Sequence, residues 1–166
     1  MRSALGFIFL GSTAVADMNE EGVGDATILL HGSCQILESG TSDQGYAAWA
    51  KRNTRIGGIG IVSIHALSKH HKRPAAWKWL LQLIETGRWI ICGDFDMVEV
   101  PMDTMCSSSI LRGSEKKCWK QCACQADLVD AWWIAAQSLG PVFSRHALRL
   151  DKLDQSRLDR FYISEH

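Results

Sequence analysis

Apolar residues along this chain repeat with two periods, and the longer period predicts a helix between two strands. Between Pro74 and Gly87, apolar side chains recur at i, i+3, i+4 and i+7, which places them on one face of a helix. These residues are Trp77, Leu80, Leu81 and Ile84. Pro74 suits the first turn of the helix, and Gly87 suits its end. Apolar runs at 59–66 and 89–92 flank the helix, so the pattern indicates a strand–helix–strand crossover of a layered α/β fold.

The same reasoning predicts the other elements. A second helix is expected over Ser114–Gln125, because apolar residues again repeat with the helical period from Trp119 to Ala126. Further strands are expected at 7–10, 26–30, 35–37, 46–51, 142–144 and 158–164, and loops at 17–25, 38–45 and 101–113. We therefore predict one domain over residues 1–166, an α/β sandwich with both helices on the outer face of a mixed sheet. Strands 59–66 and 89–94 should be neighbours in that sheet.

The first sixteen residues allow two interpretations. Arg2, the apolar stretch at 4–10 and the small residues at 14–16 before Asp17 imitate a secretory signal with its cleavage site. Gly6 interrupts the apolar stretch, whose length is at the lower limit for a signal, so we favour a strand at 7–10. Secretion, with a mature chain that starts at Asp17, is the alternative. No later stretch of the sequence is long and apolar enough to span a membrane.

Composition and charge exclude some classes of protein. With 166 residues, of which 46% are hydrophobic and 22% charged, the chain can bury a sizeable core and is not of the disordered class. Eighteen basic residues balance eighteen acidic ones, so the formal net charge is zero. No field of the whole molecule attracts nucleic acid or a membrane surface, and any binding to a polyanion must be local.

The six cysteines form no regular disulfide framework. Cys118, Cys122 and Cys124 lie close together in sequence, but their spacing is not the paired Cys-x-x-Cys of a zinc knuckle. In the predicted helix, Cys124 would point away from the other two. Cys92 lies inside an apolar strand, as a small hydrophobic residue would. We therefore expect reduced thiols in an intracellular protein, nuclear or cytoplasmic, rather than a metal centre.

The candidate chemistry follows strand 89–94, which runs through Gly93 into two carboxylates, Asp94 and Asp96. The end of such a central strand opens on the crevice where α/β sheets bind ligands. Strand alternation would direct both acids to one face, where they could share a metal ion or a phosphate. The alternative is that residues 93–96 form only a polar turn.

A basic loop at 69–73 follows the strand that carries His65. Its cations Lys69, Lys72 and Arg73 would lie at the same edge as Asp94, which makes them candidate phosphate contacts. The alternative is a solvated loop, as is typical of charge runs. Because the net charge is zero, DNA binding here should be weak, indifferent to sequence and sensitive to salt.

Several segments together resemble one known family. Gly93-Asp-Phe-Asp-Met97 resembles the Gly-Asp-Phe-Asn-Met motif of the endonuclease/exonuclease/phosphatase superfamily, which includes pancreatic deoxyribonuclease and the apurinic endonucleases. Strand 61–66 resembles the family's strand that ends in Tyr-x-Pro-Asn, with His65 in the place of Tyr. Residues 156–159 read Ser-Arg-Leu-Asp and resemble its late Ser-Arg-Ile-Asp strand. Segments 113–119 and 127–132 are similar to the endonuclease domain of plant non-LTR retrotransposons.

The resemblance implies a deoxyribonuclease-like sandwich with a magnesium-dependent endonuclease activity that nicks DNA. By this resemblance, Asp94 would position or deprotonate the attacking water, Asp159 would orient the catalytic His, and His65 could contact phosphate. Asp96 replaces an Asn that donates a hydrogen bond to a phosphate oxygen. Because ionised aspartate cannot donate, Asp96 would need a bridging metal ion. Arg157 would steady the late strand or contact a backbone phosphate.

The resemblance also implies an incomplete domain that lacks N- and C-terminal strands. We find no counterpart of the family's metal-binding Glu or of its late Ser-Asp-His, since Glu20 and Glu21 fall in a Gly-rich loop and His166 follows the late strand too closely. Asp94 and Asp96 alone would hold magnesium weakly. We therefore expect a retroelement-derived endonuclease remnant with negligible activity, whose parent polyprotein carried a reverse transcriptase. The alternatives are a non-catalytic structural fragment and a small secreted protein.

Overall fold

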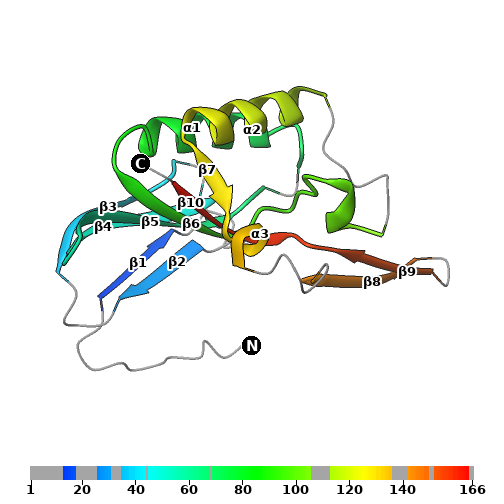
Figure 1. The fold of residues 1–166 in the computed structure, drawn as a ribbon, viewed down its shortest axis with the longest axis horizontal. Helices are drawn as coiled ribbons and strands as arrows, with labels where there is room; N and C mark the ends of the chain where they lie inside the picture. Colours follow the sequence, from blue (N-terminus) through cyan, green and yellow to red (C-terminus); the bar gives the residue numbers. More distant parts are fainter. Residues whose placement is uncertain are drawn as a thin grey trace.

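A computed structural model describes residues 13–17, 26–30, 35–43, 45–67, 69–105, 113–135, 142–149 and 152–164. These residues build a six-stranded mixed sheet, with two long helices on one face and a strand hairpin on the other (Figure 1). Along the sheet the strands are β3 (Ile36–Thr41), β4 (Ala47–Thr54), β5 (Gly57–His65), β6 (Arg88–Asp94), β10 (Asp159–Ser164) and β7 (Leu128–Asp130). β5 and β6 run parallel, and the other neighbours in the sheet run antiparallel.

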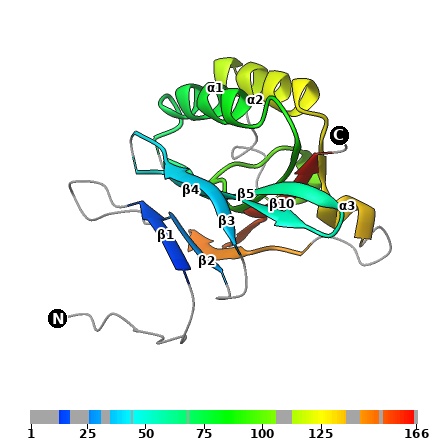
Figure 2. The ribbon, with the colours of Figure 1, turned by 90° about the vertical axis from the view of Figure 1, so that its left-hand side faces the viewer.

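Helices α1 (Arg73–Leu83) and α2 (Gly113–Gln125) lie side by side over this sheet (Figures 1 and 2). The helical stripe expected from sequence faces the strands, because Trp77 and Leu80 of α1 and Trp119 of α2 are buried in the main core. The strands supply the facing layer through Val62, Ile64, Trp89, Ile91 and Tyr162. None of the described helices is long and apolar enough to cross a membrane.

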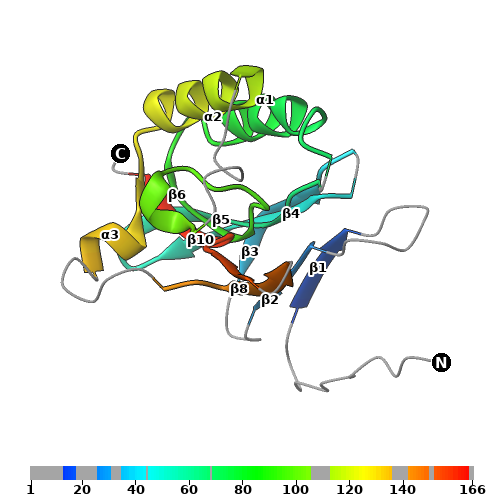
Figure 3. The same ribbon diagram turned by 90° about the vertical axis from the view of Figure 1, so that its right-hand side faces the viewer.

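The opposite face of β4 and β5 is covered by the antiparallel pair β1 (Thr13–Asp17) and β2 (Ala26–Leu30), as Figure 2 shows. Ala26 and Ile28 of β2 pack against Ala48 and Ala50 of β4 in a second, smaller core. The remaining elements are the short helix η1 (Pro101–Asp103), α3 (Ala131–Ala135), and the hairpin of β8 (Arg145–Arg149) and β9 (Lys152–Ser156), which extends beyond the sheet in Figure 1. The described chain is therefore layered, with helices, a central sheet and a partial second layer of strands (Figure 3).

The central crossover is confirmed, and several boundaries are corrected. β5 and β6 are parallel neighbours, and both helices lie on one face, as the periodicity predicts. Residues 13–17 form a strand, so the loop expected after residue 10 is wrong there, and the small residues of the candidate cleavage site lie inside this strand. The turn-rich segment expected from 38 begins later, because β3 continues to Thr41 through backbone pairing with β4. Residues 142–144 are not a strand, since pairing with β9 starts at Arg145. The strand expected at 7–10 lies outside the described residues.

Gly93 permits the close parallel pairing of β5 with β6. Its φ of +133° lies in a region that L side chains rarely adopt. A Cβ built at Gly93 would overlap the carbonyl oxygen of Ile64, its partner residue on β5. The backbone of β6 can therefore follow β5 to its end only with glycine at this position.

We predict that Gly93→Ala destabilises the protein, because it adds backbone strain and a steric overlap with Ile64. The free energy of unfolding should fall by roughly 3 kcal/mol, which lowers the melting temperature by roughly 10 °C for a chain of this size. Gly58→Ala is the matched control, since an added methyl group at Gly58 of β5 would meet open space and the φ of Gly58 is not in the left-handed region. Thermal and urea unfolding of the two variants measure the difference, and equal stabilities would contradict the prediction.

Candidate functional site

Three candidate residues meet where β5, β6 and β10 come together. β5 ends at His65, β6 ends at Asp94 and β10 begins at Asp159. His65 is directly opposite Asp94 in the parallel pair, and Asp94 is directly opposite Asp159 in the antiparallel pair. Directly opposed residues have Cβ atoms about 4.5–5.5 Å apart. The sheet register therefore brings together an imidazole and two carboxylates that are separated by up to 94 positions in sequence (159 − 65).

The three side chains share the face of the sheet that is turned away from the helices. His65 and Asp159 are exposed, whereas their chain neighbours Ile64 and Arg160 are buried. Because side chains alternate along a strand, this pattern fixes the face for each strand. The arrangement leaves His65 and Asp159 accessible to a ligand, with half-buried Asp94 between them.

Phe95 anchors the segment that carries the two central acids. Its ring is fully buried, with centroid distances of 5.8 Å to Trp77, 5.6 Å to Trp119 and 5.2 Å to Tyr162. These contacts join the end of β6 to both helices and to β10. Aromatic pairs of this kind contribute about 0.5–1.5 kcal/mol each beyond area burial. Asp94 and Asp96, on either side of Phe95, are therefore held on a rigid support.

Asp96 does not continue the strand, so the expectation from strand alternation is wrong. β6 ends at Asp94, and Asp96 has a φ of +44°, a left-handed conformation that aspartate tolerates better than most residues. Its backbone N–H donates to Asp94 Oδ1 at 2.7 Å. The two acids thus form a local turn in which Asp96 orients the Asp94 carboxylate. One Asp94 oxygen, Oδ2, has no hydrogen-bond donor among the described residues.

The guanidinium of Arg73 holds the carboxylate of Asp96. Arg73 Nη2 donates to Asp96 Oδ2 at 2.9 Å, Nη1 donates to Glu115 Oε1 at 2.8 Å, and Nε donates to the Leu67 carbonyl at 2.6 Å. The Arg73 side chain is only 7% exposed. Arg73 therefore lies in the first turn of α1 as a buried clamp between Asp96 and α2, not in an open basic loop.

Arg157 and Arg160 form a second buried network at the start of β10. Arg157 donates to Asp103 Oδ1 at 2.9 Å and to Asp130 Oδ2 at 2.7 Å. Arg160 donates to Asp103 Oδ2 at 2.7 Å and to Asp130 Oδ2 at 3.2 Å. All four side chains are buried, so the network ties β10 to η1 and β7. From the sequence, Arg157 was expected either to steady the late strand or to contact a backbone phosphate. Its contacts in this structure hold the start of β10 in place.

Solved structures show which known fold this arrangement matches. The chain aligns with the endonuclease domain of TRAS1, a telomere-specific non-LTR retrotransposon, at a TM-score of 0.66 and 14% identity, covering 95% of this chain and 69% of that one. An AP endonuclease from Archaeoglobus fulgidus aligns at a TM-score of 0.72 and 13% identity, covering 93% of this chain and 67% of that one. The 3′ phosphatase NExo from Neisseria, bound to a product DNA hairpin, aligns at 0.70 and 10% identity, covering 94% and 68%.

The described chain has the fold of the endonuclease/exonuclease/phosphatase superfamily. The fold expected from the motifs is therefore confirmed, and the chain spans about two thirds of the length of these structures. No protein-family model matches the sequence, and no curated protein matches it. The identities are low, so the likeness concerns the fold.

On this endonuclease/exonuclease/phosphatase fold, the lysines expected to contact phosphate are accessible. Lys69 and Lys72 are exposed in the loop between β5 and α1, at the end of the sheet that carries His65. The cysteines of α2 differ in exposure, since Cys118 is half-buried, Cys122 is buried and Cys124 is exposed. Burial raises the pKa of the Cys122 thiol to about 12. Among the described residues, no group of three possible ligands is placed to hold a metal ion by protein atoms alone.

Sequence reasoning missed Ser144 and Arg145. Ser144 Oγ accepts hydrogen bonds from the backbone N–H groups of Leu158 and Asp159, both at 3.0 Å, and so fixes the start of β10 beside β8. Arg145 follows as the first residue of β8, directly opposite Ser156. No local motif marks either residue, because the hydrogen bonds that hold Ser144 at the start of β10 join residues 14 and 15 positions apart in the chain.

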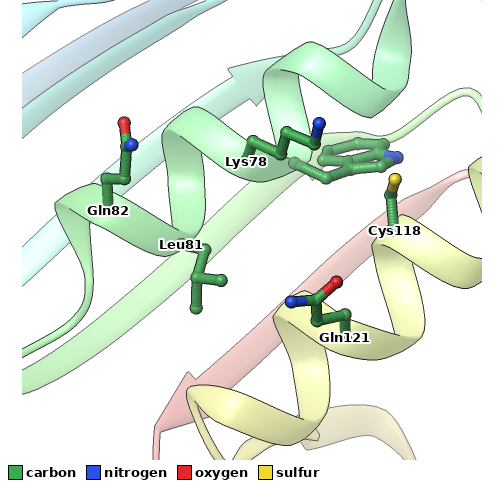
Figure 4. A pocket seen from close by; sticks show the side chains of 6 residues that line it. Lys78, Leu81, Gln82, Cys118 and Gln121 are labelled. Carbon is green, nitrogen blue, oxygen red and sulfur yellow. The ribbon is translucent and has the colours of Figure 1, made fainter.

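Two cavities adjoin the helices. One, of about 390 Å³, lies beside the site next to α3, and its lining includes Asp159 together with Trp132, Val142 and Phe161. The other, of about 260 Å³, lies between α1 and α2 (Figure 4). Its labelled lining residues come from α1 (Lys78, Leu81, Gln82) and α2 (Cys118, Gln121). Of these two cavities, the first is lined by a candidate site residue.

The charge state of Asp96 follows from these contacts. Burial raises the pKa of the Asp96 carboxyl, the charge of Asp94 adds to this rise, and the charges of Arg73 and Arg145 oppose it. Because the pKa is higher in the folded than in the unfolded state, the folded state binds more protons between the two values. Stability should therefore decrease as pH rises through this window, and the ionised Asp96 carboxylate costs stability at neutral pH.

We predict that Asp96→Asn is more stable than the unchanged chain at pH 7, and that the difference disappears below about pH 4, where the carboxyl is protonated in both states. The gain should be less than about 1 kcal/mol, because the Asp96 side chain is 35% exposed and solvent screens it. Asp127→Asn is the control, since Asp127 has the same φ of +44° but is exposed. Urea unfolding across pH 3–8 measures both, and a gain that is constant with pH would contradict the assignment.

Proposed function

We propose that this chain is a retroelement-type endonuclease domain that binds the DNA backbone at the edge formed by His65, Asp94 and Asp159, with negligible hydrolysis. The observation that carries this proposal is their alignment on three adjacent strands of a deoxyribonuclease-like fold. The likeness to the TRAS1 endonuclease domain and to two DNA-related enzymes supports the substrate class. A parent polyprotein with a reverse transcriptase and an intracellular location remain predictions that follow from the same resemblance.

The donor atoms suit magnesium better than a soft metal. Asp94 Oδ2 and Asp96 Oδ1 accept no hydrogen bond from the described residues, and the Asp159 carboxylate is exposed. Magnesium prefers such oxygens and is commonly held by one or two carboxylates together with substrate phosphate. When bound here, it would neutralise charge on the scissile phosphate. The residues therefore fit a loosely held ion that depends on the nucleic acid for further ligands.

The protein residues have separable roles in this proposal. Asp94, with its rotamer set by the Asp96 N–H, positions the attacking water through Oδ2. His65 is directly opposite Asp94 and donates a hydrogen bond to phosphate. Asp159 lies on the far side of Asp94, where its carboxylate orients a neighbouring donor. These roles include no positive charge, which a phosphate requires to approach the carboxylates of Asp94, Asp96 and Asp159.

Weak activity follows from how the carboxylates are used. Arg73 occupies one oxygen of Asp96, and the Asp96 N–H occupies one oxygen of Asp94. The remaining oxygens can hold magnesium only loosely, because the ion requires near-octahedral geometry and gives up water reluctantly. Losing one element of such a catalytic set commonly costs several orders of magnitude in rate. We therefore assign the chain to DNA binding with little or no cleavage.

We predict that the full chain binds duplex DNA with a dissociation constant between roughly 10⁻⁶ and 10⁻⁴ M at physiological salt, and that binding is lost as salt is added. Under the same conditions with magnesium, supercoiled plasmid should show no measurable nicking. Fluorescence anisotropy with two unrelated duplexes and a plasmid relaxation assay measure the two properties.

Asp94→Ala serves as the control for contaminating nuclease in the plasmid assay. Relaxation by the unchanged chain that Asp94→Ala abolishes would overturn the assignment of negligible hydrolysis. Absence of any salt-sensitive DNA binding would overturn the proposed function itself.

A further inference from the structure

A phosphate that approaches Asp94 requires a nearby cation, and two of the four expected cations are committed elsewhere. Arg73 and Arg157 are buried, with side-chain exposures of 7% and 6%, and each donates to two carboxylates. Lys69 and Lys72 are exposed, but they lie in the loop that follows β5. The edge itself carries Asp94, Asp96 and Asp159, so its own charge repels a phosphodiester.

Arg145 is placed to supply the missing positive charge. It begins β8, directly opposite Ser156, the last residue of β9, which shortly precedes the start of β10. The preceding residue, Ser144, accepts from the backbone N–H of Asp159, which fixes the Arg145 backbone beside that acid. The position of Arg145 is therefore defined by the β8–β9 backbone pairing and by the two hydrogen bonds that the neighbouring Ser144 Oγ accepts from the start of β10.

The side chain of Arg145 is available as well as close. It is half-exposed, and no ion-pair partner of Arg145 lies within the part of the chain that the structure describes. Burial raises the pKa of Asp96, and the positive charge of Arg145 partly opposes that rise, so the guanidinium lies within electrostatic reach of Asp96. Unlike Arg73 and Arg157, Arg145 combines accessibility with proximity to the site.

We propose that Arg145 is the backbone-phosphate contact of this site, with its guanidinium donating to the non-bridging oxygens of a DNA phosphodiester held beside Asp94 and Asp159. This assignment rests on the proposed function and names the protein group that receives the phosphate. Guanidinium presents paired N–H donors that match two phosphate oxygens, whereas lysine offers a single point charge. Arg145 also offsets part of the carboxylate charge and lets a polyanion reach an acidic edge.

The test compares Arg145→Ala, Arg145→Lys and Lys120→Ala in the full chain. Lys120 is an exposed cation of α2, on the helix layer and away from the site, so Lys120→Ala removes the same charge without touching the edge. Fluorescence anisotropy with a labelled duplex over roughly 50–200 mM salt gives the affinity and its salt dependence. Circular dichroism confirms that each variant folds.

We expect Arg145→Ala to weaken DNA binding about tenfold and to reduce the slope of log K against log salt by about 1, as expected for one lost phosphate contact. Arg145→Lys should restore the slope but only part of the affinity, since it keeps the charge and loses the paired donors. Lys120→Ala should leave both unchanged. Equal effects of Arg145→Ala and Lys120→Ala would overturn the assignment while the proposed function stands.

A second measurement addresses Arg145 directly. In a ¹⁵N-labelled chain, the Arg145 Nε–Hε signal, assigned by its loss in Arg145→Lys, should shift when the dinucleotide TpT is added. A signal that stays unchanged while the duplex binds would place the phosphate on other residues and overturn the assignment. If neither the duplex nor TpT binds the unchanged chain, both this assignment and the proposed function fail.

Discussion

The parallel pairing of β5 with β6 is the interaction on which the candidate site depends. Gly93 allows the two backbones to stay paired up to the last residues of both strands, where a side chain would overlap the Ile64 carbonyl. That pairing sets His65 opposite Asp94, and β10 adds Asp159 on the other side. Backbone hydrogen bonds, rather than contacts among the polar side chains, therefore place the three groups side by side.

Buried arginine–carboxylate networks hold the elements around this pairing. Arg73 joins the end of β5, the Asp96 turn and α2, while Arg157 and Arg160 join β10 to Asp103 and Asp130. Such groups are costly to desolvate. In the fully buried network of Arg157 and Arg160, removing one partner typically costs about 3–5 kcal/mol because the other charge is left buried. In this structure, Arg73 and Arg157, two of the basic residues expected at a phosphate, donate to the carboxylates of these networks.

For the proposed function, the charge distribution implies that recognition of nucleic acid is local and weak. A chain with zero net charge and an acidic edge gains little from long-range attraction. Each exposed cation near the edge should then contribute measurably to the proposed DNA affinity. This applies in particular to Arg145 at the start of β8. The cavity beside Asp159 is lined mainly by apolar side chains, among them Trp132, Val142 and Phe161.

Local signals in the sequence were enough to predict the two helices, the β5–α1–β6 crossover and the Gly93–Asp96 segment, because helical periodicity, short apolar runs and a glycine before acids need no distant partner. The motifs that predicted the fold are local in the same sense. The tertiary structure decided which cations are buried. Distant segments bring carboxylates to Arg73 and Arg157, whereas no ion-pair partner of Arg145 lies among the described residues. The Asp96 turn also depended on it, because its partner Arg73 lies 23 positions away in the chain and no local pattern records that pairing. The β8–β9 hairpin pairs nearby residues, but its position beside β10 depends on the hydrogen bonds that Ser144 accepts from Leu158 and Asp159.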